Sequence, residues 1–182
     1  MDSQSIQAYF HGAFHDGTSN RLHNTFRFCQ KEREWLEMLR NLLERLGSRS
    51  WLYQEGSTRN LYVLETSARF LAEYKSPKSF QTQAEKISYI RGYFDAEGGI
   101  PSQNSSRFYI QFTQKNLPEL LELKEILSEV GIESGRIHNP SVRVDPHYFR
   151  LFIASRSYEN FVKVVNSWHP RKKPLLDSRM KI

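Results

Sequence analysis

The chain has 182 residues, of which 38% are hydrophobic and 25% are charged, an ordinary composition for a folded globular protein. Its formal net charge of +6 and sequence pI of about 9.5 point to a polyanionic partner such as nucleic acid. No apolar run approaches the roughly 20 residues that span a bilayer, and the first residues do not resemble a signal peptide. We therefore expect no membrane association and a location in the cytoplasm or nucleoid, or in an organelle. The single cysteine, Cys29, excludes an internal disulfide, and no Cys/His cluster predicts a structural zinc site.

Hydrophobic periodicity and turn residues predict alternating helices and strands in the first part of the chain. Gly47 follows a leucine-rich segment at the position where glycine commonly ends a helix. In chain order, the predicted elements are a helix over 5–14, a strand over 22–30, a helix over 32–46, a hairpin with strands 49–54 and 60–65 around Gly56 and Ser57, and a short helix over 67–74.

The second part repeats this order after a polar segment, 75–83, which holds Pro77, has no periodicity and is interpreted as a linker. Apolar residues alternate strictly in 107–114, where Phe108, Ile110 and Phe112 share one face of a predicted strand. The predicted elements are a helix over 83–96, a hairpin turn near Asn104 and Ser105, the strand 107–114, a helix with Pro118 in its first turn, a hairpin across 140–146, a strand over 147–154 and a helix over 157–168.

Residues 28–47 and 112–131 form an internal repeat that aligns without a gap. The two segments share a Phe-x-Gln-Lys entry, leucines at matching positions and a closing glycine. Amphipathic helices share some leucines by chance, so the entry and the exit carry more weight than the leucines. The repeat predicts a molecule built from two similar halves.

The segment 90–98, IRGYFDAEG, resembles the nine-residue signature of the LAGLIDADG homing-endonuclease family. Gly92 falls on the first glycine of that signature, and Asp95 and Glu97 fall on its two acids. A glycine in a helix interior lowers helix stability by about 1 kcal/mol relative to alanine. The usual reason for a glycine at such a position is the close approach of a partner helix. A weaker copy, FHGAFHDGT, occupies 10–18, and the basic segment 168–173, WHPRKK, is similar to one that closes many family members.

The resemblance implies an α/β (α+β) fold of two pseudo-symmetric αββαββα halves. The two motif helices would pack against each other at Gly12 and Gly92, and two antiparallel, saddle-shaped sheets would lie in the DNA major groove. We expect an N-terminal half over 1–74, a linker over 75–83 and a C-terminal half over 84–182. A chain with two motifs supplies its own helix interface, so we expect a monomer.

The resemblance further implies metal-assisted hydrolysis of DNA phosphodiester bonds at the bottom of the seam between the motif helices. Mg²⁺ is the expected metal because it prefers hard oxygen ligands; Mn²⁺ should substitute for it, and Ca²⁺ should bind without cleavage. Glu97 would be the intact metal ligand. Polar strand-end residues and basic residues are expected beside it, and the candidates are Gln30, Gln114, Lys78, Arg171 and Lys172.

Strand alternation predicts which side chains face DNA. Arg and Gln suit bidentate contacts to guanine and adenine, whereas lysines more often touch phosphate. The candidates are His23, Thr25, Arg27, Arg49, Trp51 and Arg59 in the first half, and Gln103, Arg107, Tyr109, Gln111, Thr113, Arg136, His138 and Arg143 in the second.

The first motif departs from the family pattern. Aligned without a gap from Gly12, His15 falls on the first acid and Gly17 on the metal ligand, which leaves this half with no second acid. Aligned with a one-residue deletion, Asp16 becomes the metal ligand. Cleavage of both strands needs a metal site for each strand, so the position of Asp16 matters for function.

Two functions follow from the resemblance. One is a site-specific endonuclease for double-stranded DNA with a long asymmetric target, in which Asp16 and Glu97 hold the metal. The alternative is a nicking or cleavage-deficient member that binds DNA or intron RNA, as a maturase or a regulator. If Asp16 cannot reach the seam, the alternative gains.

Overall fold

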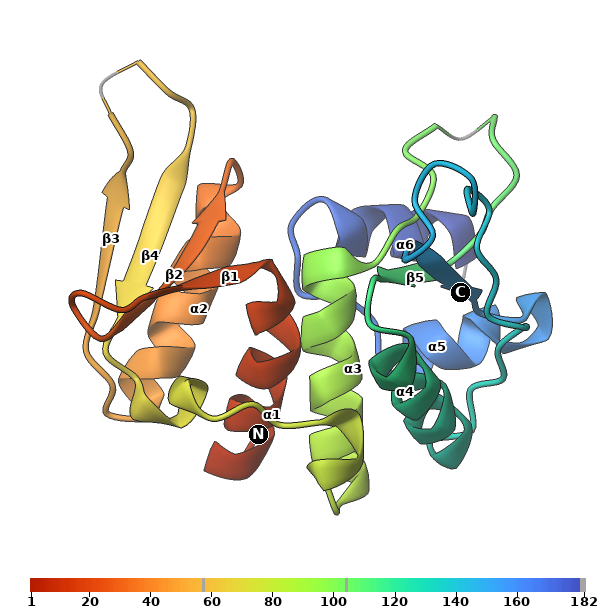
Figure 1. Cartoon of the computed structure of the whole chain (residues 1–182), viewed down its shortest axis with the longest axis horizontal. Helices are drawn as coiled ribbons and strands as arrows, with labels where there is room; N and C mark the ends of the chain where they lie inside the picture. Colours follow the sequence, from red (N-terminus) through yellow and green to blue (C-terminus); the bar gives the residue numbers. More distant parts are fainter. Residues whose placement is uncertain (57, 104, 181–182) are drawn as a thin grey trace.

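The computed structural model describes residues 1–56, 58–103 and 105–180, and consists of two halves that meet along a central pair of helices (Figure 1). The first half contains α1 (Ser3–Ala13), the 3-10 turn η1 (Phe14–Asp16), β1 (Gly17–Asn20), β2 (Thr25–Gln30), α2 (Arg33–Arg45), β3 (Ser50–Gln54), β4 (Tyr62–Thr66) and the 3-10 turn η2 (Arg69–Ala72). The second half contains η3 (Pro77–Ser79), α3 (Gln83–Glu97), β5 (Gln111–Gln114), α4 (Leu117–Glu129), β6 (Phe149–Phe152), η4 (Ser155–Ser157), α5 (Tyr158–Val164) and α6 (Lys172–Met180). The order of elements confirms the predicted pseudo-symmetric mixed fold.

The central pair consists of α1 and α3, whose backbones touch at two glycines. A Cβ atom built on Gly12 would lie 2.1 Å from the carbonyl oxygen of Tyr89, and one built on Gly92 would lie 2.0 Å from that of Tyr9. Real Cβ atoms do not approach backbone so closely, so each helix admits only glycine where it crosses the other. Both motif helices therefore end side by side, which sets the position of the residues that follow them.

The first half forms a four-stranded antiparallel sheet in the order β1-β2-β4-β3. Alternation along β2 and β4 directs Phe26, Phe28 and Leu64 toward α1 and α2, where they are buried. The other face of the sheet, here called the outer face, carries polar and aromatic side chains. The sheet thus has one face in the core and one face available to a partner.

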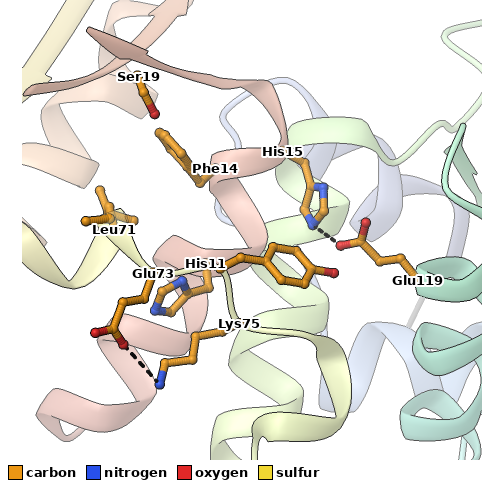
Figure 2. A pocket seen from close by; sticks show the side chains of 10 residues that line it. His11, Phe14, His15, Ser19, Leu71, Glu73, Lys75 and Glu119 are labelled. Carbon is orange, nitrogen blue, oxygen red and sulfur yellow. Dashed lines mark ion pairs between the residues drawn. The ribbon is translucent and has the colours of Figure 1, made fainter. Parts of the chain in front are cut away.

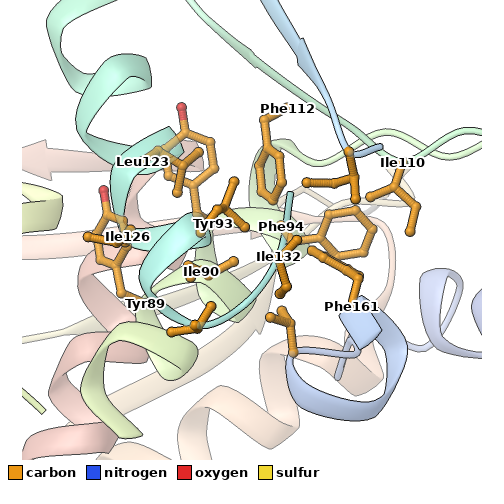
Figure 3. Close-up of a cluster of buried hydrophobic side chains, with 14 of the residues drawn as sticks. Tyr89, Ile90, Tyr93, Phe94, Ile110, Phe112, Leu123, Ile126, Ile132 and Phe161 are labelled. Carbon is orange, nitrogen blue, oxygen red and sulfur yellow. The ribbon is translucent and has the colours of Figure 1, made fainter. Parts of the chain in front are cut away.

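The second half has a smaller sheet, in which only β5 and β6 pair as strands. Single bridges extend it, joining Gly99 to Gln111 and His138 to Arg150. Its core is nevertheless as large as that of the first half, because α3, α4 and α5 bury aromatic and branched side chains between them (Figure 3). The predicted hairpins of this half are therefore mostly loops in the described part of the chain.

The internal repeat corresponds to β2 with α2 and to β5 with α4. Matching leucines are fully buried in both copies, as Leu36 and Leu120 illustrate. Gly47 and Gly131 end the two helices with φ angles of +67° and +77°, a left-handed conformation that glycine adopts without steric cost. The closing glycines of the repeat thus have the helix-ending role expected of them.

Three elements of the first half differ from the prediction. The strand predicted over 22–30 begins at Thr25, because residues 21–24 form a turn in which Leu22 is 85% exposed. Edge strand β1 was not predicted, since its sequence GTSN has no apolar alternation and only its backbone pairs with β2. The helix predicted over 67–74 is the single turn η2.

The C-terminal prediction also needs correction. The helix predicted over 157–168 ends at Val164, close to Asn166, whose φ of +53° is incompatible with a continuing helix. A further helix, α6, follows it and was not predicted. The turn predictions at Ser57 and Asn104 lie outside the described residues. Within the described ranges, no helix is both long and apolar enough to cross a membrane.

Candidate metal and nucleic-acid site

Asp16 and Glu97 lie together where the two central helices end. Helix α1 stops at Ala13 and continues as the 3-10 turn η1, which rises about 2.0 Å per residue instead of 1.5 Å and carries Asp16 farther along the seam. Burial raises the pKa of Glu97, and the negative charge of Asp16 raises it further. Burial also raises the pKa of Asp16, although a hydrogen bond from the Gln30 side chain opposes that effect. The two carboxylates therefore interact across the seam.

These two carboxylates fit a divalent cation. Each has a raised pKa that a positive charge between them would lower, and both offer the hard oxygen atoms that Mg²⁺ prefers. Mg²⁺ is usually held by one or two carboxylates, with water and substrate phosphate as its remaining ligands. Among the described residues no group of three or more His, Cys, Asp and Glu side chains is placed to hold a metal ion.

Behind the acids, Tyr9 and Asp95 link the two helices. The Tyr9 hydroxyl donates a 2.7 Å hydrogen bond to Asp95 and accepts one of 3.0 Å from the Trp35 indole. Asp95, 1% exposed, also accepts from the Ser167 hydroxyl and from the Trp168 backbone N–H, the latter at 3.0 Å. The first acid of the second motif is therefore a buried structural carboxylate.

A second buried pair repeats this arrangement with different chemistry. Tyr89 is the repeat partner of Tyr9, and its hydroxyl lies 3.0 Å from Nε2 of His15, which stands where the other half has Asp95. The flanking helix here contributes Glu119 in place of Trp35, and its Oε1 lies 3.0 Å from His15 Nε2. The acid that the first motif lacks is thus supplied by α4, and the buried tyrosine hydroxyl has a hydrogen-bond partner in both halves.

His15 also borders a cavity beside Glu97. The cavity measures about 310 Å³ and is lined by His15, Glu97, Thr113, Gln114, Lys115 and Tyr148. The Gln114 amide donates to the Tyr93 hydroxyl at 3.0 Å and lies 3.3 Å from Nδ1 of His15. Gln114 and its repeat partner Gln30 therefore lie on the two sides of the seam, each near one acid.

A second cavity, of about 380 Å³, opens beside residues 71–75, which lead into the linker (Figure 2). His15 points toward Glu119 in it, whereas Glu73 and Lys75 pair with each other (Figure 2). His11 borders it as well, and burial lowers the pKa of that imidazole to about 4. His11 of α1 packs against Phe70 and Phe80, whereas His15 of η1 pairs with Glu119, so the two histidines engage different partners.

Residues 167–172, here called the C-terminal strap, cross from the second half to the first. The Trp168 ring packs 4.7 Å from the ring of Tyr9, and the Arg91 guanidinium lies 4.6 Å from the same indole. The next residue, His169, packs 5.3 Å from Trp35 of α2. The strap therefore fastens the two halves together beneath the acids.

Lys172 lies at the end of the strap, and it or Arg171 was predicted to stand beside the scissile phosphate. It is 6% exposed, and its ammonium donates to the carbonyl oxygens of Phe94 and Asp95 at 2.7 and 2.8 Å. Its positive charge also opposes the rise in the pKa of Glu97 and of Asp16. Burial lowers the pKa of Lys172 to about 8, so it stays largely charged at neutral pH. A cation at the negative end of a helix is stabilising, and Lys172 thereby holds the end of α3 that carries Glu97.

Replacement of Lys172 by methionine tests this role. The variant keeps the aliphatic stem but leaves the α3 carbonyls unpaired, so we expect a loss of about 1–3 kcal/mol of stability in urea denaturation. The salt dependence of DNA binding should stay as in the unmodified protein, because no phosphate contact is removed. Lys173→Met, which removes an exposed lysine, is the matched control for stability. If Lys172 touches phosphate instead, the Lys172→Met variant should bind DNA with a smaller salt dependence. The slope of the logarithm of the binding constant against the logarithm of salt concentration should then shrink by about 0.9.

Two other basic predictions fare differently. Lys78 was expected near the active site, but it lies in η3, before the start of α3, and pairs with Glu125 of α4. Glu97 stands at the opposite end of α3, about 20 Å away along the helix. That prediction was wrong, since the linker returns along the base of the molecule (Figure 1). Arg171 is exposed and lies 3.9 Å from Glu32.

The outer face of the first sheet presents two of the residues predicted to face DNA, Arg27 and Trp51. Trp51 is 51% exposed, and Arg27 lies in the middle of the sheet beside Glu65. Thr25 is an exception: it is buried, and its hydroxyl is engaged by Glu65, so it offers no contact to a partner. The remaining predicted residues, His23, Arg49 and Arg59, are exposed in loops or next to strand ends.

The second half presents its predicted contacts mainly on loops. The Arg179 guanidinium of α6 donates to the carbonyl oxygens of Gln103 and Ser106 and so ties one of these loops to the body. The exposed candidates are Gln103, Arg107, Arg136, His138 and Arg143, and the partly buried ones are Tyr109, Gln111 and Thr113.

Sequence reasoning missed the residues that support the acids. His15, Glu119 and Tyr93 were not predicted as site residues, although the ungapped alignment of the motifs places His15 opposite Asp95. Tyr9 and Tyr89 stand three residues before the two motif glycines, and that shared spacing was the available signal.

Comparisons with known proteins agree with this fold. The model of the LAGLIDADG-like domain matches residues 6–77 and 84–166. No curated protein sequence matches the chain. Among solved structures, I-DmoI in complex with DNA and Ca has a TM-score of 0.71 at 18% identity and covers 100% of both chains.

Two further solved structures are similar. I-DmoI in complex with DNA and Mn has a TM-score of 0.67 at 19% identity, over 90% of this chain and 97% of that one. The N-terminal LAGLIDADG domain of DUF199/WhiA has a TM-score of 0.68 at 16% identity, over 91% of this chain and 82% of that one. At such identities the likeness lies in the fold.

Proposed function

The chain belongs to the LAGLIDADG-like domain family, and we propose that it is a site-specific, divalent-metal-dependent DNA endonuclease. The observation that carries the proposal is the placement of Asp16, in η1, against the end of α3 that carries Glu97, where the charge of Asp16 raises the pKa of Glu97. Only one of the two alignments of the first motif gives that half a second acid, and η1 brings that acid to the seam. The similar structures of I-DmoI with DNA and with Mn or Ca support a DNA substrate and a divalent metal.

In this mechanism Asp16 and Glu97 hold the metal, with Mg²⁺ as the physiological ion. When bound, Mg²⁺ lowers the pKa of water and offsets the charge that develops on the phosphate. Gln30 donates to Asp16 and fixes its orientation, while Lys172 secures the end of α3. The outer face and the loops of the second half bind the DNA duplex. Because α1 and α3 already supply both sides of the seam, the active species is a monomer on an asymmetric target.

A second candidate is a family member that binds DNA, or intron RNA, without cutting both strands. The observation that favours it is His15, which stands where the second motif has an acid. The fold alone does not choose between the candidates, because it is shared by I-DmoI and by the WhiA domain.

Selection from a randomised duplex library separates the candidates. DNA bound in Ca²⁺ is collected, Mg²⁺ is added, and all new ends are sequenced by strand. Enrichment of a long asymmetric site with paired breaks is the expected result. Breaks on one strand would indicate nicking, and enrichment without breaks would favour the binding protein. Failure to enrich any DNA at low salt, where phosphate contacts are strongest, would overturn the DNA substrate.

A further inference from the structure

Arg27 occupies the middle of a row of side chains that crosses the first sheet. The strand register places Thr18, Arg27, Glu65 and Trp51 next to one another on β1, β2, β4 and β3. Arg27, Glu65 and Trp51 lie on the outer face, because the neighbours Phe26, Phe28, Leu64 and Leu52 pack into the core. Thr18 lies on the same face because it pairs directly with Arg27. An antiparallel ribbon of this kind fits the major groove of B-DNA, where base edges are exposed.

Hydrogen bonds fix the orientation of the Arg27 guanidinium. Its Nη2 lies 3.3 Å from the Tyr53 hydroxyl and 3.3 Å from a Glu55 carboxylate oxygen. The Tyr53 hydroxyl donates in turn to Glu65 at 2.9 Å, and the Thr25 hydroxyl donates to the other oxygen of the same carboxylate. The hydrogen bond from Thr25 has the largest effect in lowering the pKa of Glu65, and the bond from Tyr53 adds to it, so the carboxylate stays charged. The network therefore aims the arginine before any partner binds.

The charges around Arg27 do not suit a simple phosphate contact. Arg27 pairs with Glu55, which also pairs with Arg59, and Glu65 lies beside them, so the two guanidinium groups here are matched by two carboxylates. Two carboxylates beside an arginine weaken its attraction for a polyanion and so reduce affinity. Such an arrangement can still raise specificity, because carboxylates beside the arginine repel DNA sequences that do not offer it a matching base. The gain in specificity comes with a loss of affinity.

We propose that Arg27 specifies a guanine in the DNA target, with Tyr53 and Glu65 holding its guanidinium in place. The inference rests on the proposed function and assigns one base-reading residue to it. Nη1 makes no hydrogen bond to any residue that the structure describes, and the Arg27 side chain is 28% exposed. Guanine offers two adjacent acceptors, O6 and N7, in the major groove, and arginine is their usual partner.

The test compares variants by library selection in Ca²⁺ and by binding to the selected site and its single-base-pair substitutions. Arg27→Lys keeps the charge but loses the planar fork. We expect discrimination at one G·C pair to fall by roughly 5- to 100-fold, while other positions and the salt slope stay unchanged. Tyr53→Phe removes the orienting hydroxyl, and we expect weaker discrimination at the same pair. Arg40→Ala, on the exposed side of α2, is the matched loss of an arginine and should change neither profile.

Each other outcome overturns the inference. A loss of affinity that is equal at all positions in Arg27→Ala, with a reduced salt slope, would make Arg27 a phosphate contact. The wild-type protein could select a site while Arg27→Lys and Tyr53→Phe both keep its base preferences at every position. In that case other residues would read the guanine. If the wild-type protein selects no sequence, the proposed function fails together with the inference.

Discussion

Alanine in place of Gly92 is expected to destabilise the protein by roughly 2–4 kcal/mol. The added methyl group would lie 2.0 Å from the Tyr9 carbonyl oxygen and 2.9 Å from the Ala13 nitrogen. Both are backbone atoms of α1, so the helices must move apart and every contact along the seam must adjust. Alanine favours a helix over glycine by about 1 kcal/mol, which offsets only part of this cost. Urea denaturation followed by circular dichroism measures the difference.

Gly135→Ala is the matched control for this experiment. A Cβ atom at Gly135 would lie 3.7 Å from its nearest neighbour, an ordinary van der Waals distance. Its effect should stay within about 0.5 kcal/mol. Equal denaturation midpoints for Gly92→Ala and the unmodified protein would contradict the close backbone contact of α1 and α3.

Replacing Glu97 by glutamine should have opposite effects on activity and stability. The amide is a poor ligand for a hard cation, so we expect cleavage in Mg²⁺ to fall by about 10³-fold or more. In the absence of metal, the melting temperature should rise. Burial and the charge of Asp16 both raise the pKa of Glu97, which means that the folded protein disfavours the charged form present at pH 7. Removing that charge therefore stabilises the metal-free protein.

Strand-resolved plasmid cleavage and thermal melting in EDTA test the two effects. Glu159→Gln, an exposed acid on α5, is the control and should change neither. Asp16→Asn should match Glu97→Gln if both acids serve both strands. Unchanged cleavage in Glu97→Gln would remove this residue from the metal site, and a lower melting temperature would contradict the unfavourable charge.

The helices and their packing were predictable because their causes are local and repeated. The leucine ladder, the Phe-x-Gln-Lys entry and the closing glycine recur at a fixed spacing, and each of these features has one structural reason. Gly92 was informative because a glycine inside a helix has a cost that only close packing repays. A pattern of this kind survives even when the overall identity to known structures is as low as 18%.

Other features depend on contacts that no local pattern records. Strand β1 consists of small polar residues held only by backbone bonds to β2, and α6 follows a turn at Asn166 that the sequence does not announce. The role of Lys172 depends on carbonyl groups 77 and 78 residues away in the chain. The position of Asp16 depends on the change from an α-helix to a 3-10 turn, which an alignment can represent only as a gap.

The unequal tyrosine pairs make each half dependent on the other. Tyr9 meets one acid, Asp95 from the opposite motif helix, and Tyr89 meets one acid, Glu119 from its own half. A symmetric dimer of the second half would bury both kinds of acid around each tyrosine, and like charges in a dry site repel strongly. A symmetric dimer of the first half would have neither. Only the mixed pair gives each tyrosine one acid, so neither half could replace the other in this interface.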